Sequence, residues 1–127
     1  MTTPTPTPAT PAFVDTDFLR DHPHAVLADV RWYLDGRDGY AAFQSGHLPG
    51  AVWVDLDHQL AAADLPATEG RHPFPSPQAF ADSMSALGIG NDSLVVAYDD
   101  TGGLTAGRLV VMLRMLGCQA EIGRAHV

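Results

Sequence analysis

The residues from Asp99 to Thr105 have the types and spacing of an anion-binding loop. They read Asp99-Asp100-Thr101-Gly102-Gly103-Leu104-Thr105, directly after an apolar run and directly before an amphipathic pattern. Glycines let backbone amides turn inward, and the N-terminus of a following helix adds partial positive charge, so such a loop forms a cradle for an anion. The alternative is that Asp99 and Asp100 cap the helix and satisfy those amides themselves, and the local sequence favours this alternative.

The order of residues disfavours two other functions, nucleotide binding and catalysis by Cys118. The loop lacks the lysine of a phosphate-binding P-loop, and Gly88-Ile89-Gly90 lies between a helix and a strand, the reverse of the dinucleotide-binding order. Cys118, the single cysteine, follows the predicted helix end at Gly117, where no helix N-terminus is available to stabilise a thiolate. We therefore predict that Cys118 is a small, semi-buried apolar residue.

The histidines do not form a metal-ligand pattern. His22 and His24 lack the partner carboxylate cluster that a metal site requires. His47 and His72 lie close to prolines in loops, where histidines are candidate binding groups. The sequence therefore predicts neither a metal nor a cofactor.

Short apolar runs alternate with helical patterns along the chain. We predict strands at 13–14, 25–30, 51–55 and 94–98, and helices from Asp15 or Thr16 to before Pro23, at 40–45, from Ser76-Pro77 to Gly88, and at 105–116. This order indicates the α/β class, with a mostly parallel sheet and helices on both faces. Ligands bind beyond the carboxyl ends of the strands in such sheets, which is where the loop after Tyr98 lies.

Composition sets the limits of function. The chain has 127 residues, enough for one domain, and a formal net charge of -8, which disfavours nucleic-acid binding in the absence of a basic stripe. One cysteine excludes an internal disulfide framework. No run approaches the roughly 20 apolar residues of a membrane span, and the N-terminus lacks the pattern of a signal peptide. We expect a cytoplasmic protein that binds no membrane.

The first 12 residues, MTTPTPTPATPA, are rich in threonine and proline. Proline has no amide donor and a fixed φ, so we expect residues 1–12 to be a disordered, polyproline-like leader. A docking peptide for a proline-reading module is the other interpretation of this segment.

A series of motifs then resembles a known family. The segment Gly46-His47-Leu48-Pro49-Gly50-Ala51 resembles the GHIPGA signature of rhodanese domains. The other matching stretches, in order, are Leu27-Ala28-Asp29-Val30-Arg31-Trp32-Tyr33-Leu34, Gly36-Arg37-Asp38-Gly39, Gly70-Arg71-His72-Pro73, Leu87-Gly88-Ile89-Gly90-Asn91-Asp92, Val95-Val96-Ala97-Tyr98-Asp99, Thr105-Ala106-Gly107-Arg108 and Met112-Leu113-Arg114. The chain is identified by this series as similar to the N-terminal domain of two-domain thiosulfate/3-mercaptopyruvate sulfurtransferases.

The resemblance implies a specific chemistry. In these enzymes a cysteine of the C-terminal domain, at the mouth of the anion cradle, takes a sulfane sulfur as a persulfide and passes it to cyanide or a thiol. Asp99 occupies the equivalent position here, so the loop from Asp99 to Thr105 is expected to be a vestigial, non-catalytic cradle. The expected partners are a C-terminal catalytic domain of the same protein, small anionic sulfur donors, and thiol or cyanide acceptors.

The resemblance also points to Asp38 and His47. Acidic and histidine side chains of the N-terminal domain have proton-relay roles in mercaptopyruvate-type members, and these two residues are the positions that could inherit a substrate-facing or relay role. The alternative is structural, with a turn aspartate and a loop histidine fixing the backbone.

The chain end departs from the family. We expect a domain at 13–120 and a non-native tail at 121–127, because Glu121-Ile122-Gly123-Arg124-Ala125-His126-Val127 matches the translation of a sequencing adapter. The family's fifth, interior strand is then expected to be missing or replaced.

Two rival functions follow from the same residues. The first is a stand-alone, catalytically inactive rhodanese module that acts in binding or regulation. The second is a single-domain phosphatase or thiol enzyme that uses Cys118, which the position of Cys118 after a helix argues against.

Overall fold

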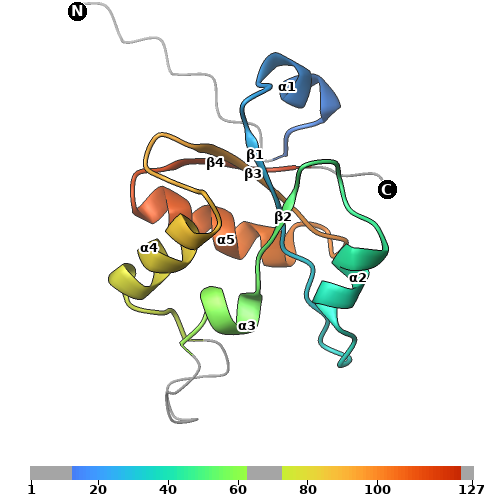
Figure 1. The fold of residues 1–127 in the computed structure, drawn as a ribbon, viewed down its shortest axis with the longest axis vertical. Coiled ribbons are helices and arrows are strands. Elements are labelled where there is room, and N and C mark those ends of the chain that lie inside the picture. Colours follow the sequence, from blue (N-terminus) through green and yellow to red (C-terminus); the bar gives the residue numbers. More distant parts are fainter. Residues whose placement is uncertain (1–12, 63–72, 124–127) are drawn as a thin grey trace, which may run out of the picture.

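A four-stranded parallel sheet runs through the computed structural model, which describes residues 13–62 and 73–123 (Figure 1). The strand order is β2-β1-β3-β4, and each neighbouring pair is parallel. The strands are β1 (Val26–Asp29), β2 (Val52–Trp53), β3 (Leu94–Tyr98) and β4 (Gln119–Ile122). The predicted α/β class with a parallel sheet is confirmed.

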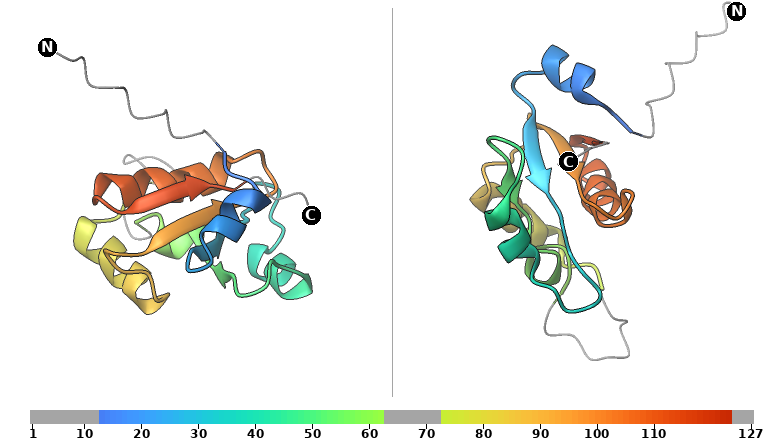
Figure 2. Two further views of the ribbon diagram at one scale, coloured as in Figure 1. Left: turned by 90° about the horizontal axis from the view of Figure 1, so that it is seen from above. Right: turned by 90° about the vertical axis from the view of Figure 1, so that its right-hand side faces the viewer.

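Helices cover both faces of this sheet (Figure 2). One face carries α5 (Leu104–Met115), and the other carries α2 (Gly39–Ser45), α3 (Leu56–Gln59) and α4 (Pro77–Ala86). The short α1 (Thr16–Asp21) precedes β1 and lies beyond its amino end. The expected three-layer arrangement is therefore present.

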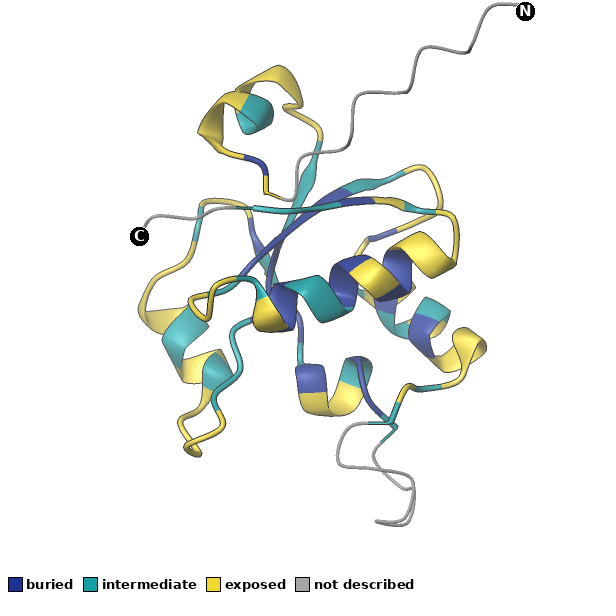
Figure 3. Cartoon of the chain, turned by 180° about the vertical axis from the view of Figure 1, so that it is seen from behind, coloured by how far each residue is buried: buried dark blue, intermediate teal, exposed yellow. Residues whose placement is uncertain are grey.

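The core lies between the sheet and these helices (Figure 3). In β3, four consecutive residues from Val95 to Tyr98 are buried, as expected for a strand covered on both faces. In α5, Ala106, Leu109 and Leu113 recur at helical spacing, and each is at most 1% exposed. Burying each large apolar side chain contributes about 1.5–3 kcal/mol, so α5 and β3 supply much of the stabilisation.

Local capping explains where the helices begin. The carboxylate of Asp15 accepts hydrogen bonds from the amides of Asp17 and Phe18 at the start of α1. The hydroxyl of Ser76 accepts from the amide of Ala79 at 3.1 Å, and proline fills the first position of α4. Both caps are those that the sequence predicts.

The interior strand that we expected to be missing or replaced is present as β4. It pairs with β3 on one side, and Val14 forms a parallel bridge with Gly123 on the other. The expectation followed from interpreting residues 121–127 as a non-native tail, yet Glu121 and Ile122 belong to this strand. Gly123 suits its place, because a Cβ there would lie 2.9 Å from a methyl carbon of Val96.

The sheet therefore continues three residues past the expected domain boundary at 120. Residues 1–12 and 124–127, which hold the expected leader and most of the expected tail, lie outside the described residues. The structure also contains α3, in a connection where we predicted no helix; its four residues are too few to show a helical period.

A buried ion pair fastens the carboxyl end of β1 to α2. Asp29 is fully buried, and the Arg31 guanidinium donates to both of its carboxylate oxygens at 2.8–3.0 Å. The same guanidinium donates to the carbonyls of Ala42 and Gly46, and the hydrogen bonds with Asp29 raise the pKa of Arg31. This arrangement satisfies the buried charge and holds the end of α2 against the sheet.

We expect Arg31→Ala to lower the free energy of unfolding by about 3–5 kcal/mol, because it leaves the buried Asp29 carboxylate without its partner. Arg37→Ala is the matched control, since it breaks an ion pair with Asp35 whose side chains are 68% and 59% exposed. That control should cost about 1 kcal/mol or less. Urea unfolding followed by circular dichroism measures both losses, and equal losses would contradict the role given to Arg31.

Candidate functional site

Five hydrogen-bond donors converge on the carboxylate of Asp99, directly after β3. Its Oδ1 accepts from the amides of Thr101 and Gly103, each at 2.9 Å. Its Oδ2 accepts from the amide and the hydroxyl of Thr105, each at 3.0 Å, and from the amide of Ala106 at 2.8 Å. The donors of this loop therefore surround an anion, and Asp99 itself supplies it.

Glycine makes this loop shape accessible. Gly102 and Gly103 have φ values of 73° and 94°, in the left-handed region that other residues rarely adopt. Gly103 is the N-cap of α5 and has no side chain to accept from the first helical amides. The Asp99 carboxylate performs that capping from four or more residues earlier in the chain.

The charge state of Asp99 follows from these contacts. Burial of the carboxyl group acts to raise its pKa, but the hydrogen bonds from Ala106, Gly103, Thr101 and the Thr105 hydroxyl outweigh burial. The pKa of Asp99 therefore lies below its ordinary value of 3.8. At neutral pH the cradle holds a full negative charge that belongs to the protein.

Asp100 points to a different partner from Asp99. The hydroxyl of Tyr33 donates to the Asp100 carboxylate at 2.6 Å, and this hydrogen bond raises the pKa of Tyr33. The guanidinium of Arg37 lies 4.0 Å from the centre of the Tyr33 ring and pairs with Asp35. The loop after β1 is thereby tied to the loop after β3.

Asp38 and His47 lie at opposite ends of α2. The carboxylate of Asp38 caps the helix by accepting from the amide of Tyr40 at 2.9 Å. The His47 ring stacks on Phe43 at 3.8 Å, with its Nδ1 2.7 Å from the Phe43 carbonyl oxygen. A seven-residue helix is about 10 Å long, so the structure does not bring Asp38 and His47 together.

The loop that carries His47 is held on both sides of that residue. Arg31 donates to the Gly46 carbonyl, and the Tyr98 hydroxyl accepts from the Leu48 amide at 3.0 Å. Burial raises the pKa of Tyr98 to about 12, so its hydroxyl stays protonated. Tyr98 immediately precedes Asp99 in the chain. The end of β3 therefore positions both the loop of His47 and the cradle. The sequence did not reveal that Arg31 and Tyr98 hold this loop, although Arg31 lies in the family motif from Leu27 to Leu34.

Cys118 lies at the other end of the sheet. It is half-buried, directly precedes β4, packs against the core, and donates its amide to the Leu113 carbonyl. The loop from Asp99 to Thr105 lies at the carboxyl ends of the strands, whereas Cys118 lies at their amino ends. The length of the strands therefore separates Cys118 from this loop.

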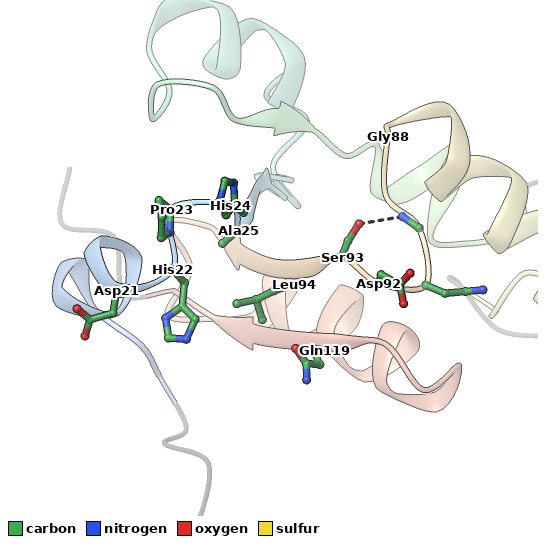
Figure 4. A pocket seen from close by; sticks show the side chains of 12 residues that line it. Asp21, His22, Pro23, His24, Ala25, Gly88, Asp92, Ser93, Leu94 and Gln119 are labelled. Carbon is green, nitrogen blue, oxygen red and sulfur yellow. Dashed lines mark hydrogen bonds between the residues drawn. The ribbon is translucent and has the colours of Figure 1, made fainter.

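His22 and His24 belong to no group that could hold a metal ion among the described residues. His22 and His24 line a cavity of about 760 Å³ at the amino ends of the strands, together with Asp21 and Asp92 (Figure 4). Across residues 13–62 and 73–123, no group of three or more histidine, cysteine or acidic side chains is placed to hold a metal ion. None of the helices described is long and apolar enough to cross a bilayer. His72 lies outside the described residues.

Asp99→Asn should destabilise the domain by about 2–3 kcal/mol. The NH₂ group of the asparagine would replace one carboxylate oxygen and face the backbone amides that donate to that oxygen, so these donors would lose their acceptor. Asp100→Asn is the matched control, and we expect it to change stability by less than about 0.5 kcal/mol, since an exposed amide oxygen still accepts from Tyr33. Denaturant unfolding gives both values.

The stability difference between the natural chain and the Asp99→Asn variant should also depend on pH. Folding lowers the pKa of Asp99 from 3.8. The stabilisation of the folded state by the Asp99 carboxylate is therefore complete above pH 3.8, and it is lost as the pH falls through the lower pKa of the folded state. A difference that stays constant on acidification would contradict this assignment.

Comparisons with known proteins agree with this geometry. The family model for the rhodanese-like domain matches residues 16–123. A putative thiosulfate sulfurtransferase, SseB, from Mycobacterium tuberculosis is 47% identical over 74 residues, which are 58% of this chain and 26% of that protein. A probable 3-mercaptopyruvate sulfurtransferase from Pseudomonas aeruginosa is 38% identical over 96 residues, which are 75% of this chain and 34% of that protein.

A solved structure shows the same architecture. The 3-mercaptopyruvate sulfurtransferase from Leishmania major superposes with a TM-score of 0.80 at 30% sequence identity, covering 92% of this chain and 33% of that one. The chain thus spans between a quarter and about a third of the length of these three proteins. The matched family model, which covers most of the chain, shows that the protein belongs to the rhodanese family.

Proposed function

We propose that the chain is the N-terminal, non-catalytic rhodanese domain of a two-domain sulfurtransferase. The complete protein would move a sulfane sulfur from thiosulfate or 3-mercaptopyruvate to a thiol or cyanide, through a cysteine persulfide in its other domain. The observation that carries this proposal is the Asp99 carboxylate, which fills the cradle where a sulfur-carrying cysteine would stand. The chain covers only 26% and 34% of the length of two relatives, which supports the proposal that it is one domain of a longer protein.

The chemistry of sulfur transfer explains why this domain would carry no sulfur. A cysteine thiolate attacks the sulfane sulfur of thiosulfate, a new S–S bond forms, and sulfite leaves with the electron pair of the broken bond. An acceptor thiolate or cyanide then takes the outer sulfur and regenerates the thiolate. A carboxylate is a poor nucleophile toward sulfur, and both oxygens of Asp99 are already engaged by donors.

The carboxyl-end face would contact the catalytic domain. Leu34, in the loop after β1, is 73% exposed, and Leu104, at the start of α5, is 76% exposed. Both loops are tied together by Tyr33 and Asp100. Exposed leucines on a rigid face are suited to burial against a partner, and a C-terminal domain of the same protein is the partner we propose.

His47 is the residue of this face that we assign a substrate-facing role. It is exposed, and the anchoring of Gly46 and Leu48 fixes its backbone. Asp38 would act indirectly by capping α2, because the length of that helix separates it from His47.

A stand-alone binding module is the second candidate. The internally satisfied cradle and the exposed Leu104 are compatible with a domain that presents this loop to another protein. The coding sequence downstream of residue 120 separates the two: a catalytic cysteine loop supports the sulfurtransferase, and a stop codon supports the module.

The 127-residue chain should form no thiocyanate above background from cyanide with either thiosulfate or 3-mercaptopyruvate, because no thiol lies in the cradle. A colorimetric thiocyanate assay measures this. Cys118→Ser is the control, because Cys118 is the only thiol in the chain. Activity that this substitution abolishes would overturn the proposal that the domain is inactive by itself.

A further inference from the structure

Helix α5 is apolar on both of its faces. One face packs on β3 and β4, whereas the outer face carries, at intervals of four, three and four residues, Leu104, Arg108, Val111 and Met115. Leu104 and Met115 are 76% and 73% exposed, and Val111 is 51% exposed. Exposed and buried residues alternate along the helix (Figure 3). Because a helix that is apolar all round is normally buried all round, the outer face of α5 has the composition of a contact surface.

Helix α4 has the opposite composition on its exposed face. The residues at the same spacing there are all polar and all exposed, namely Gln78, Asp82 and Ser85. In contrast, α5 contains no acidic residue, in a chain whose formal net charge is -8. The spacing on α5 is that of the apolar positions of helices that pack against other helices. The outer face of α5 therefore suits an apolar partner surface better than it suits water.

Arg108 does not place a free charge in this apolar surface. Its guanidinium carbon lies 4.5 Å from the centre of the Phe74 ring, and its Nε donates to the Leu60 carbonyl at 3.0 Å. An arginine held in this way lays its methylene stem along apolar surface. Phe74 is itself exposed and lies against Arg108, so it widens the outer face of α5.

The position of α5 in the fold indicates what covers this face. Leu104 belongs both to the outer face of α5 and to the carboxyl-end face that we propose to contact the catalytic domain. The carboxyl end of β4 lies beside the first turn of α5, because a Cβ at Gly103 or Gly107 would lie 3.4 or 3.7 Å from a side-chain carbon of Ile122. The chain covers 26% and 34% of two relatives, so most of the length of each relative has no counterpart in it. A domain that follows β4 would start beside this helix.

A domain of the same protein fits the outer face of α5 better than a second copy of the chain. Each partner in a stable complex of separate molecules buries about 800 Å². One face of a 12-residue helix, about 18 Å long, is small for that purpose. A tethered domain is held at high effective concentration, so a smaller contact suffices.

We propose that the outer face of α5 is buried against an apolar segment of the catalytic domain of the same protein. The contact between the two domains then extends from the carboxyl-end loops along α5 to Met115. This inference rests on the proposed function, because it requires the second domain.

Photo-cross-linking in the complete two-domain protein tests this contact. Benzoylphenylalanine replaces Val111 or Met115, one at a time, and in the matched control it replaces the exposed Ser85 of α4. After irradiation, mass spectrometry identifies the cross-linked peptides. We expect positions 111 and 115 to cross-link to peptides that lie beyond residue 127 in the same molecule, and position 85 to form no such cross-link.

Two results would overturn the inference. The first is that cross-links from positions 111 and 115 stay within residues 1–127, or that position 85 forms as many to the other domain. The second is a cross-linked product of twice the monomer mass, which would assign the face to a second copy. Thiocyanate formation by the same variants tests the proposed function separately. An active protein without cross-links between its domains overturns this inference alone, and an inactive protein that forms them overturns the sulfurtransferase role alone.

Val111→Asp provides an energetic test that does not depend on the cross-linker. A carboxylate buried against an apolar segment is unfavourable, so this variant should melt several degrees below the Ser85→Asp control in the complete protein. In the 127-residue chain, where Val111 is half-exposed, the two variants should melt alike. Equal melting temperatures of the two variants in the complete protein would contradict burial of this face.

Discussion

The convergence of five donors on the Asp99 carboxylate organises the whole carboxyl-end face of the domain. These hydrogen bonds join the end of β3 to the first turn of α5 and force the left-handed backbone at Gly102 and Gly103. An asparagine at this position would leave part of these donors unpaired, because only its amide oxygen accepts hydrogen bonds. The loop therefore depends on the negative charge of Asp99.

A second set of contacts builds on the same strand ends. The Asp29–Arg31 ion pair at the end of β1 and the Tyr98 hydroxyl at the end of β3 hold the loop of His47 from both sides. The loops after β1 and β3 are then joined through Tyr33. Together these contacts brace a face with exposed leucines, which is the physical basis for our proposal that a partner domain covers it.

Much of this fold was predictable because its signals are local. The run 94–98 has the same bounds as β3, since an unbroken apolar run is what a strand buried on both faces requires, and Asp15 and Ser76 act within three residues of their own positions. The site's scaffold was not predictable, because the hydrogen bond from Leu48 to Tyr98 joins residues 50 positions apart. Strand β4 was expected to be missing or replaced because residues 121–127 were interpreted as a non-native tail, although Gln119–Ile122 pairs with β3 along its whole length.

The central claim is that an ionised carboxylate of the protein itself, that of Asp99, fills the anion cradle after β3. Titration of the Asp99 side-chain carboxyl by ¹³C NMR tests this most directly, because five donors to an anion must favour its charged form. We predict a pKa for Asp99 below 3.8, with the amide signals of Thr101, Gly103 and Ala106 moving at the same midpoint. A pKa at or above 3.8, with those amide signals unaffected, would contradict it.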